Sequence, residues 1–98
     1  MVQQIKTFLV KRQKLVAAEY VCKEVFEGKL FSDVGFYTST GTNYIELCDK
    51  ETGKTLMTFT GETIEDVLLY FLMVFFPKET DAALEEIVRE EKIEDLLD

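Results

Sequence analysis

The first third of the chain alternates apolar and polar residues at helical spacing. Between residues 13 and 28, one stripe is apolar and holds Leu15, Ala18, Cys22, Val25 and Phe26. Off this stripe lie the charged residues Glu19, Lys23 and Glu27, with Arg12 just before it. This spacing predicts an amphipathic helix, and Gly28 suits the left-handed position that ends one. Residues 3–12 fit either a strand or an extension of that helix. Because no turn residue separates the two parts, we expect one long helix.

The middle of the chain changes to short stretches rich in β-branched and aromatic residues. Residues 34–39, 43–48 and 54–60 are separated by polar segments with glycine, which predicts a three-stranded antiparallel meander. In the second strand, Ile45 and Leu47 face one way, and Tyr44, Glu46 and Cys48 face the other. The third strand has no strong polar–apolar alternation, so we expect both of its faces to be partly covered.

The next segment, IEDVLLYFLMVFF, is apolar nearly all round, with Thr63 as its expected N-cap and Pro77 as its stop. Its run of ten apolar residues spans roughly 15 Å as a helix, about half of a bilayer core, so we expect no membrane span. A chain this small rarely surrounds such a helix. We therefore expect self-association, most simply as a homodimer, through Tyr70, Phe75 and Phe76.

A last, acidic helix follows from residue 81, with Thr80 as its expected N-cap. Its apolar period breaks between Val88 and Ile93, which predicts a kink or separate docking near Glu91 and Lys92. The whole chain has 98 residues, of which 47% are hydrophobic. We expect one α+β domain over residues 1–98, with an N-terminal helix, a three-stranded antiparallel meander, an apolar helix and an acidic C-terminal helix. One face of the sheet lies on helices, and the other is either solvated or an interaction surface.

Charge is unevenly distributed along the chain, whose formal net charge is −8. Residues 1–30 carry six Lys or Arg against three Glu, whereas residues 61–98 carry three Lys or Arg against twelve Asp or Glu. Two interpretations stay open and are compatible. The acidic C-terminal segment docks on the basic N-terminal helix, or it presents an acidic surface to a basic partner.

Catalytic and metal-binding signals are weak. The chain has no His, and its two cysteines, Cys22 and Cys48, form no CxxC pair, which favours small buried side chains in a reducing, cytoplasmic setting. The Asp49–Gly53 segment lacks the glycine and the acidic ligand that a calcium loop needs at its sixth and twelfth positions, so a hairpin turn is expected. We expect no enzyme activity, no metal and no cofactor.

Four basic residues near the N-terminus raise the question of nucleic-acid binding: Lys6, Lys11, Arg12 and Lys14. The order of helix, three antiparallel strands and helix resembles the double-stranded RNA-binding domain in outline. That family needs a basic start to its second long helix, and residues 61–66 here read GETIED. With the net negative charge, this departure argues against nucleic-acid binding.

The sequence therefore favours a small acidic protein-binding module. Such proteins, often carried by phages or mobile elements, act as inhibitors, immunity proteins or adaptors by presenting carboxylates to a basic, nucleic-acid-binding partner. The expected partner-binding residues are Glu85, Glu86, Glu90, Glu91, Glu94 and Asp95. The alternative is a self-assembling structural subunit without a foreign partner.

Overall fold

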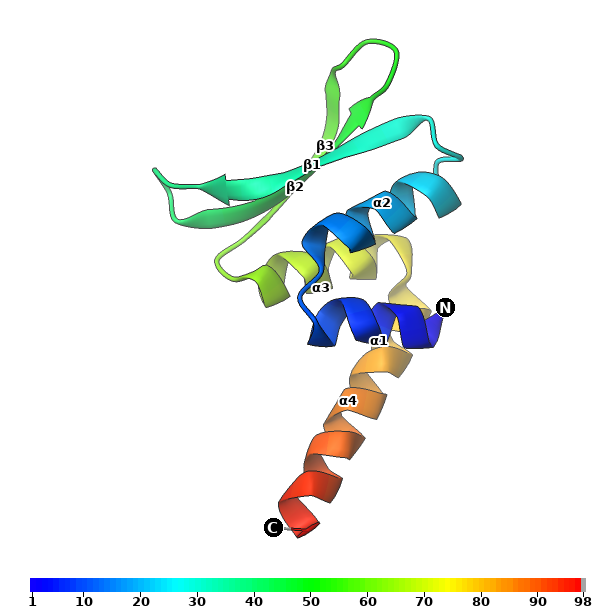
Figure 1. Ribbon diagram of the computed structural model, residues 1–98, viewed down its shortest axis with the longest axis vertical. Coiled ribbons are helices and arrows are strands. Elements are labelled where there is room, and N and C mark those ends of the chain that lie inside the picture. Colours follow the sequence, from blue (N-terminus) through cyan, green and yellow to red (C-terminus); the bar gives the residue numbers. More distant parts are fainter. Residues whose placement is uncertain (98) are drawn as a thin grey trace.

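The computed structural model describes the backbone of residues 1–97 and the side chains of residues 1–91. Two helices precede a three-stranded antiparallel sheet, and two helices follow it, so the expected α+β class is confirmed (Figure 1). The elements are α1 (Val2–Val10), α2 (Lys14–Glu24), β1 (Leu30–Tyr37), β2 (Thr42–Asp49), β3 (Thr55–Gly61), α3 (Ile64–Phe75) and α4 (Pro77–Leu97).

The N-terminal segment is helical but not one helix, so the expectation of a continuous helix is wrong. Arg12 adopts a left-handed backbone with φ of 55°, and the amide of Gln13 donates to the carbonyl of Phe8. This six-residue closure is a Schellman motif, which normally carries glycine at the left-handed position. Because arginine stands there, no glycine marks the break in the sequence.

The second helix also ends earlier than its apolar stripe predicts. Helix α2 stops at Glu24, and the chain then turns through two left-handed residues, Glu27 and Gly28, with φ of 53° and 75°. Gly28 therefore has the backbone conformation expected of it, but it lies beyond the helix rather than directly after it.

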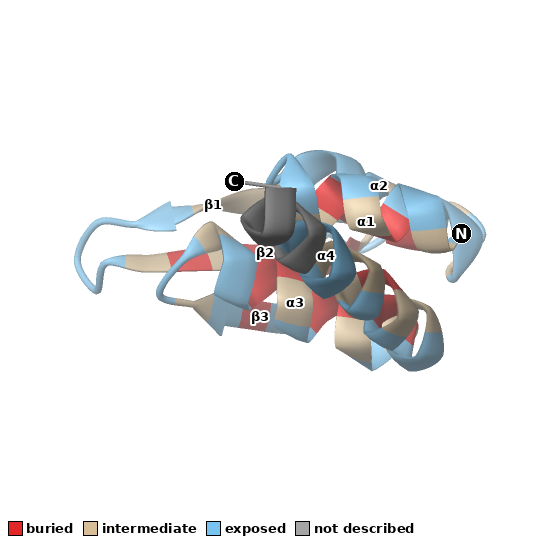
Figure 2. Ribbon diagram, turned by 90° about the horizontal axis from the view of Figure 1, so that it is seen from below, coloured by how far each residue is buried: buried red, intermediate tan, exposed pale blue. Residues whose placement is uncertain are grey.

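The sheet has strand order β1-β2-β3, and only one of its faces is covered by helices. Helices α2 and α3 pack on the face that carries Ile45, Leu47 and Phe59 (Figure 2). On the opposite face, Leu56, Thr58 and Thr60 are all exposed, so the expectation that both faces of the third strand are partly covered is wrong. The facing assigned to Ile45 and Leu47 is confirmed.

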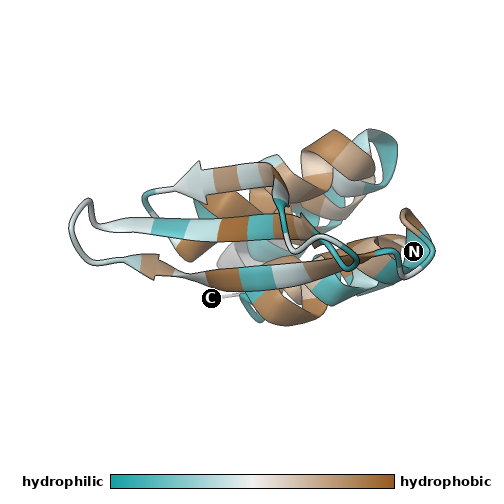
Figure 3. Ribbon diagram, turned by 90° about the horizontal axis from the view of Figure 1, so that it is seen from above, coloured by the Kyte–Doolittle hydropathy of each residue, from teal (hydrophilic) through white to brown (hydrophobic). Residues whose placement is uncertain are grey.

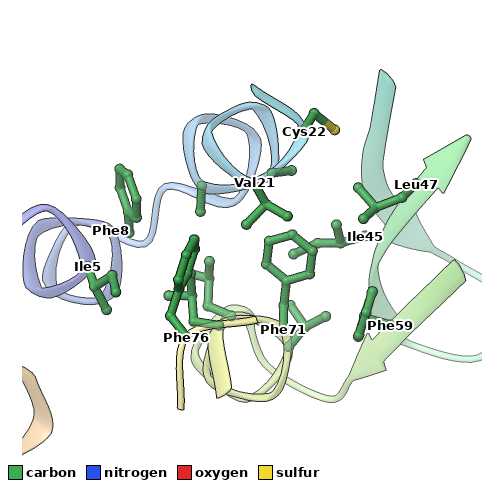
Figure 4. Packing of buried hydrophobic residues seen from close by; sticks show 14 of the residues in the cluster. Ile5, Phe8, Val21, Cys22, Ile45, Leu47, Phe59, Phe71 and Phe76 are labelled. Atoms are coloured by element: carbon green, nitrogen blue, oxygen red, sulfur yellow. The ribbon is translucent and has the colours of Figure 1, made fainter. Parts of the chain in front are cut away.

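The core lies between the sheet and the helices, with Phe71 of α3 at its centre (Figure 4). Its ring is fully buried and meets the ring of Phe59 edge-on, at 5.0 Å between centroids. Ile5 and Phe8 bring α1 into the same cluster. Because one contiguous core joins all four helices to the sheet, the chain forms a single packing unit.

Helix α3 begins as expected, but helix α4 begins earlier than expected. Thr63 caps α3 as predicted, since its hydroxyl accepts from the amide of Asp66 at 3.1 Å. Helix α4, however, begins directly at Pro77, where proline's missing N–H costs nothing. Thr80 is therefore not an N-cap: it lies inside the first turn, fully buried, and its hydroxyl makes no hydrogen bond.

Helix α4 leaves the body of the protein and runs without interruption from Pro77 to Leu97, so the helix does not end near Glu91 and Lys92, where the apolar period breaks (Figure 1). It packs on α1 and α3. Within the described residues, no helix has the length and apolarity that crossing a bilayer requires.

Candidate protein-binding surfaces

The acidic face of α4 docks in part on α1, which answers a question the sequence left open. Lys6 of α1 donates a hydrogen bond to Glu90 and lies 3.8 Å from a carboxylate oxygen of Glu86. Gln3, one turn earlier, donates to Glu86 at 2.8 Å. The bond to Glu90 raises the pKa of Lys6. Glu86 and Glu90 are thus engaged within the chain.

The other predicted glutamates are freer. Glu85 has a side chain that is 71% exposed, and among residues 1–91 it pairs only with Arg89 of its own helix, at 3.7 Å. Glu91 is exposed at the rim of a groove of about 360 Å³ between α1, α3 and α4, which is floored by Leu9, Val10, Leu69, Leu84 and Ile87. The side chains of Glu94 and Asp95 lie outside the described residues.

The basic N-terminal cluster does not form one free patch. Lys6 faces α4, and Arg12 pairs with Glu65 at the start of α3. Lys14 reaches the sheet, where its ammonium donates to the carbonyl of Gly35 and to Asn43, both at 2.9 Å. Burial there lowers the pKa of Lys14. These three cations are thus engaged within the chain.

The three residues expected to self-associate have different surroundings. Tyr70 is 54% exposed, although one edge of its ring meets Phe59. Phe75 is half-buried between Phe26 and Phe59. Phe76 is a core residue next to Tyr20, with 8% of its surface exposed. Of the three, only Tyr70 offers substantial surface to a second chain.

The uncovered face of the sheet is a further candidate surface, which no motif in the sequence marks. Hydrophilic and hydrophobic residues alternate along the strands, which Figure 3 shows from this side. The outward positions are Phe31, Asp33, Gly35 and Tyr37 of β1, Thr42, Tyr44, Glu46 and the buried Cys48 of β2, and Leu56, Thr58 and Thr60 of β3. This set contains two carboxylates and no cation.

An aromatic stack lies on this face near the β1–β2 turn. Gly35 is the cross-strand partner of Tyr44, whose ring lies directly over it: a Cβ on Gly35 would stand 2.9 Å from that ring. The ring of Tyr37 stacks on Tyr44, with centroids 4.3 Å apart and an angle of 16° between the planes. The glycine therefore allows the stack to lie flat on the sheet.

Two carboxylates border the stack. Asp33 and Glu46 are direct cross-strand partners, and like charges in that position destabilise a sheet. The Tyr37 hydroxyl donates to Glu46 at 2.7 Å, which raises the pKa of Tyr37 to about 12. Partial burial raises the pKa of Tyr44, and the nearby carboxylates Asp33 and Glu46 add to that rise. Neither carboxylate has an ion-pair partner among the described residues.

The two cysteines and the Asp49–Gly53 segment are the remaining candidate sites. Cys22 and Cys48 are buried and unpaired, and burial raises the pKa of the Cys22 thiol. The Asp49 carboxylate accepts from the amide of Glu51 and from the hydroxyl of Thr52, which is the expected hairpin turn. No three potential ligand side chains in residues 1–91 converge as a metal site.

Comparison with known proteins gives no relationship. No protein family, curated protein or solved structure matches this chain.

Proposed function

We propose that this chain is a non-catalytic module that binds a basic protein through the acidic surface of α4. One observation carries the proposal: α4 has more carboxylates than the chain neutralises. Residues 77–91 contain six Asp or Glu against Lys78 and Arg89. Among the ion pairs of the described residues, Lys6 is the only cation from outside α4 that reaches it. The excess negative charge is therefore available to a positively charged partner.

A protein that normally binds nucleic acid is the kind of partner this surface fits. Carboxylates spaced along an exposed helix offer negative charges to the Lys and Arg side chains that contact phosphates. An inhibitor, immunity protein or adaptor, as carried by phages and mobile elements, would act in this way. Glu85 and Glu91 are the principal partner-binding residues in this proposal, because Glu86 and Glu90 also hold α1.

The test is capture of partners from nuclease-treated lysate with tagged protein, at low and high salt. The double variant Glu85→Lys, Glu91→Lys should lose a stoichiometric basic partner that the wild type retains at low salt. The matched control Glu24→Lys, Glu51→Lys makes the same change of charge at exposed sites on α2 and the β2–β3 turn. Equal capture by wild type and the α4 variant would refute the proposal.

Self-assembly is a second candidate, favoured by the exposed side of α3. Tyr70 and Val74 lie one turn apart on that helix and are 54% and 49% exposed. A structural subunit would bury this pair against another copy. Sedimentation equilibrium tests it: Tyr70→Lys should convert an oligomer to a monomer, whereas a wild type that is already monomeric removes this candidate.

A further inference from the structure

The outward face of the sheet combines stacked tyrosine rings with carboxylates. Its aromatic stack is built on Gly35, and 37% of the surface of Tyr37 remains exposed above Tyr44. An exposed tyrosine ring attracts a cation over its face. Stacking on Tyr44 positions the Tyr37 ring, and the Tyr37 hydroxyl also donates to Glu46.

The charges around this stack lack a counter-ion. Asp33 and Glu46 face each other across β1 and β2, and the outward positions of the sheet carry no Lys or Arg. A cation placed between the two carboxylates would relieve their repulsion. The sheet face is thus complementary to positive charge independently of α4, with which it shares no residue.

We propose that the sheet face formed by Tyr37, Tyr44, Asp33 and Glu46 binds an arginine side chain of a partner protein. This inference rests on the proposed binding of a basic protein and names the side chain that the sheet would take. A guanidinium is planar, stacks on an aromatic ring and donates several N–H groups in its own plane. It can lie on Tyr37 while its edge donates to the carboxylates. A lysine ammonium is more strongly hydrated and lacks the planar edge, so arginine is favoured.

The experiment titrates the isotope-labelled full chain with a blocked arginine tripeptide and, separately, with the lysine tripeptide of equal charge, followed by NMR. The arginine peptide should shift amides of β1 and β2 and bind about threefold more tightly than the lysine peptide. Tyr37→Leu should abolish that preference, whereas Tyr37→Phe, which keeps the ring, should retain it. If Tyr37→Phe also loses the preference while the other β1 and β2 amide signals stay in place, the ring face does not select arginine and the inference is overturned.

A pair of variants with equal change of charge separates this site from α4. Asp33→Asn removes one carboxylate from the sheet face, and Glu85→Asn removes one from α4. Only the first should weaken binding of the arginine peptide, by about threefold. Shifts confined to α4, or equal weakening by both variants, overturn the inference and leave the proposed function standing. If lysate capture by α4 fails while the peptide still binds β1 and β2, the proposed function falls and the arginine site stands.

Discussion

The buried hydroxyl of Thr80 allows a test of where α4 begins. Thr80 is fully buried and its Oγ1 has no hydrogen-bond partner, while its amide donates to the carbonyl of Phe76 at 2.9 Å. Thr80 is thus the fourth residue of the helix, and Phe76 precedes the first. A buried hydroxyl without a partner costs about 1–3 kcal/mol of stability. Valine has nearly the same shape and a similar helix propensity.

Thr80→Val should therefore raise the free energy of unfolding, by about 1 kcal/mol. If Thr80 instead caps the helix, Thr80→Val should lower the free energy of unfolding, because losing a cap costs about 0.5–2 kcal/mol. Thr63 provides the matched control, since its hydroxyl does cap α3. Thr63→Val should lower stability by about 1 kcal/mol.

Urea denaturation of the wild type and the two variants measures both effects. The slope of the free energy of unfolding against urea concentration should be the same for all three. Thermal unfolding gives a second reading, because 1 kcal/mol moves the midpoint of a domain this size by about 4–8 °C. If Thr80→Val destabilises the protein as much as Thr63→Val does, the placement of Thr80 inside the first turn is refuted.

Three further predictions concern the sheet face and the core. Gly35→Ala should lower the free energy of unfolding of the wild type, where Tyr44 covers the glycine, but raise that of the Tyr44→Thr variant by about 0.5–1 kcal/mol. Urea unfolding of the four proteins measures both changes, and equal changes in the two backgrounds would contradict the packing of Tyr44 on Gly35. Because the pKa of Tyr37 is raised to about 12, the stability from its bond to Glu46 is full below pH 10 and lost as pH rises toward 12. NMR titration should show Glu46→Thr returning that pKa toward 10, and an unchanged value refutes the bond. Phe71→Ala should lower the free energy of unfolding by about 3–5 kcal/mol in urea, whereas a loss below 1 kcal/mol argues against its central place.

Local signals in the sequence were sufficient for the element types. The antiparallel meander, the Thr63 cap and the stop at Pro77 each depend on residues close together in the chain, and each is present. The errors arose where a local rule had a competitor. Arginine at position 12 took the left-handed place that glycine usually fills, and Pro77 started α4 where Thr80 also fitted a cap.

The candidate surfaces were less predictable than the elements. The sequence identified an acidic helix but not that Lys6 and Gln3 engage two of its glutamates. It placed Phe76 among the self-association residues, although Tyr20 and the core cover that ring. In each case the deciding contact joins residues far apart in the chain, which spacing along the sequence does not reveal.

The sequence by itself determined the α+β class, the strand pairing and the excess of negative charge, because hydrophobic period, turn residues and charge are properties of neighbouring residues. Tertiary structure decided which carboxylates are neutralised and which aromatic rings stay exposed. Asp33 and Glu46 are thirteen positions apart in the chain, yet the register of β1 on β2 makes them partners beside Tyr37. Only the packing of helices on one face of the sheet leaves that group in solvent.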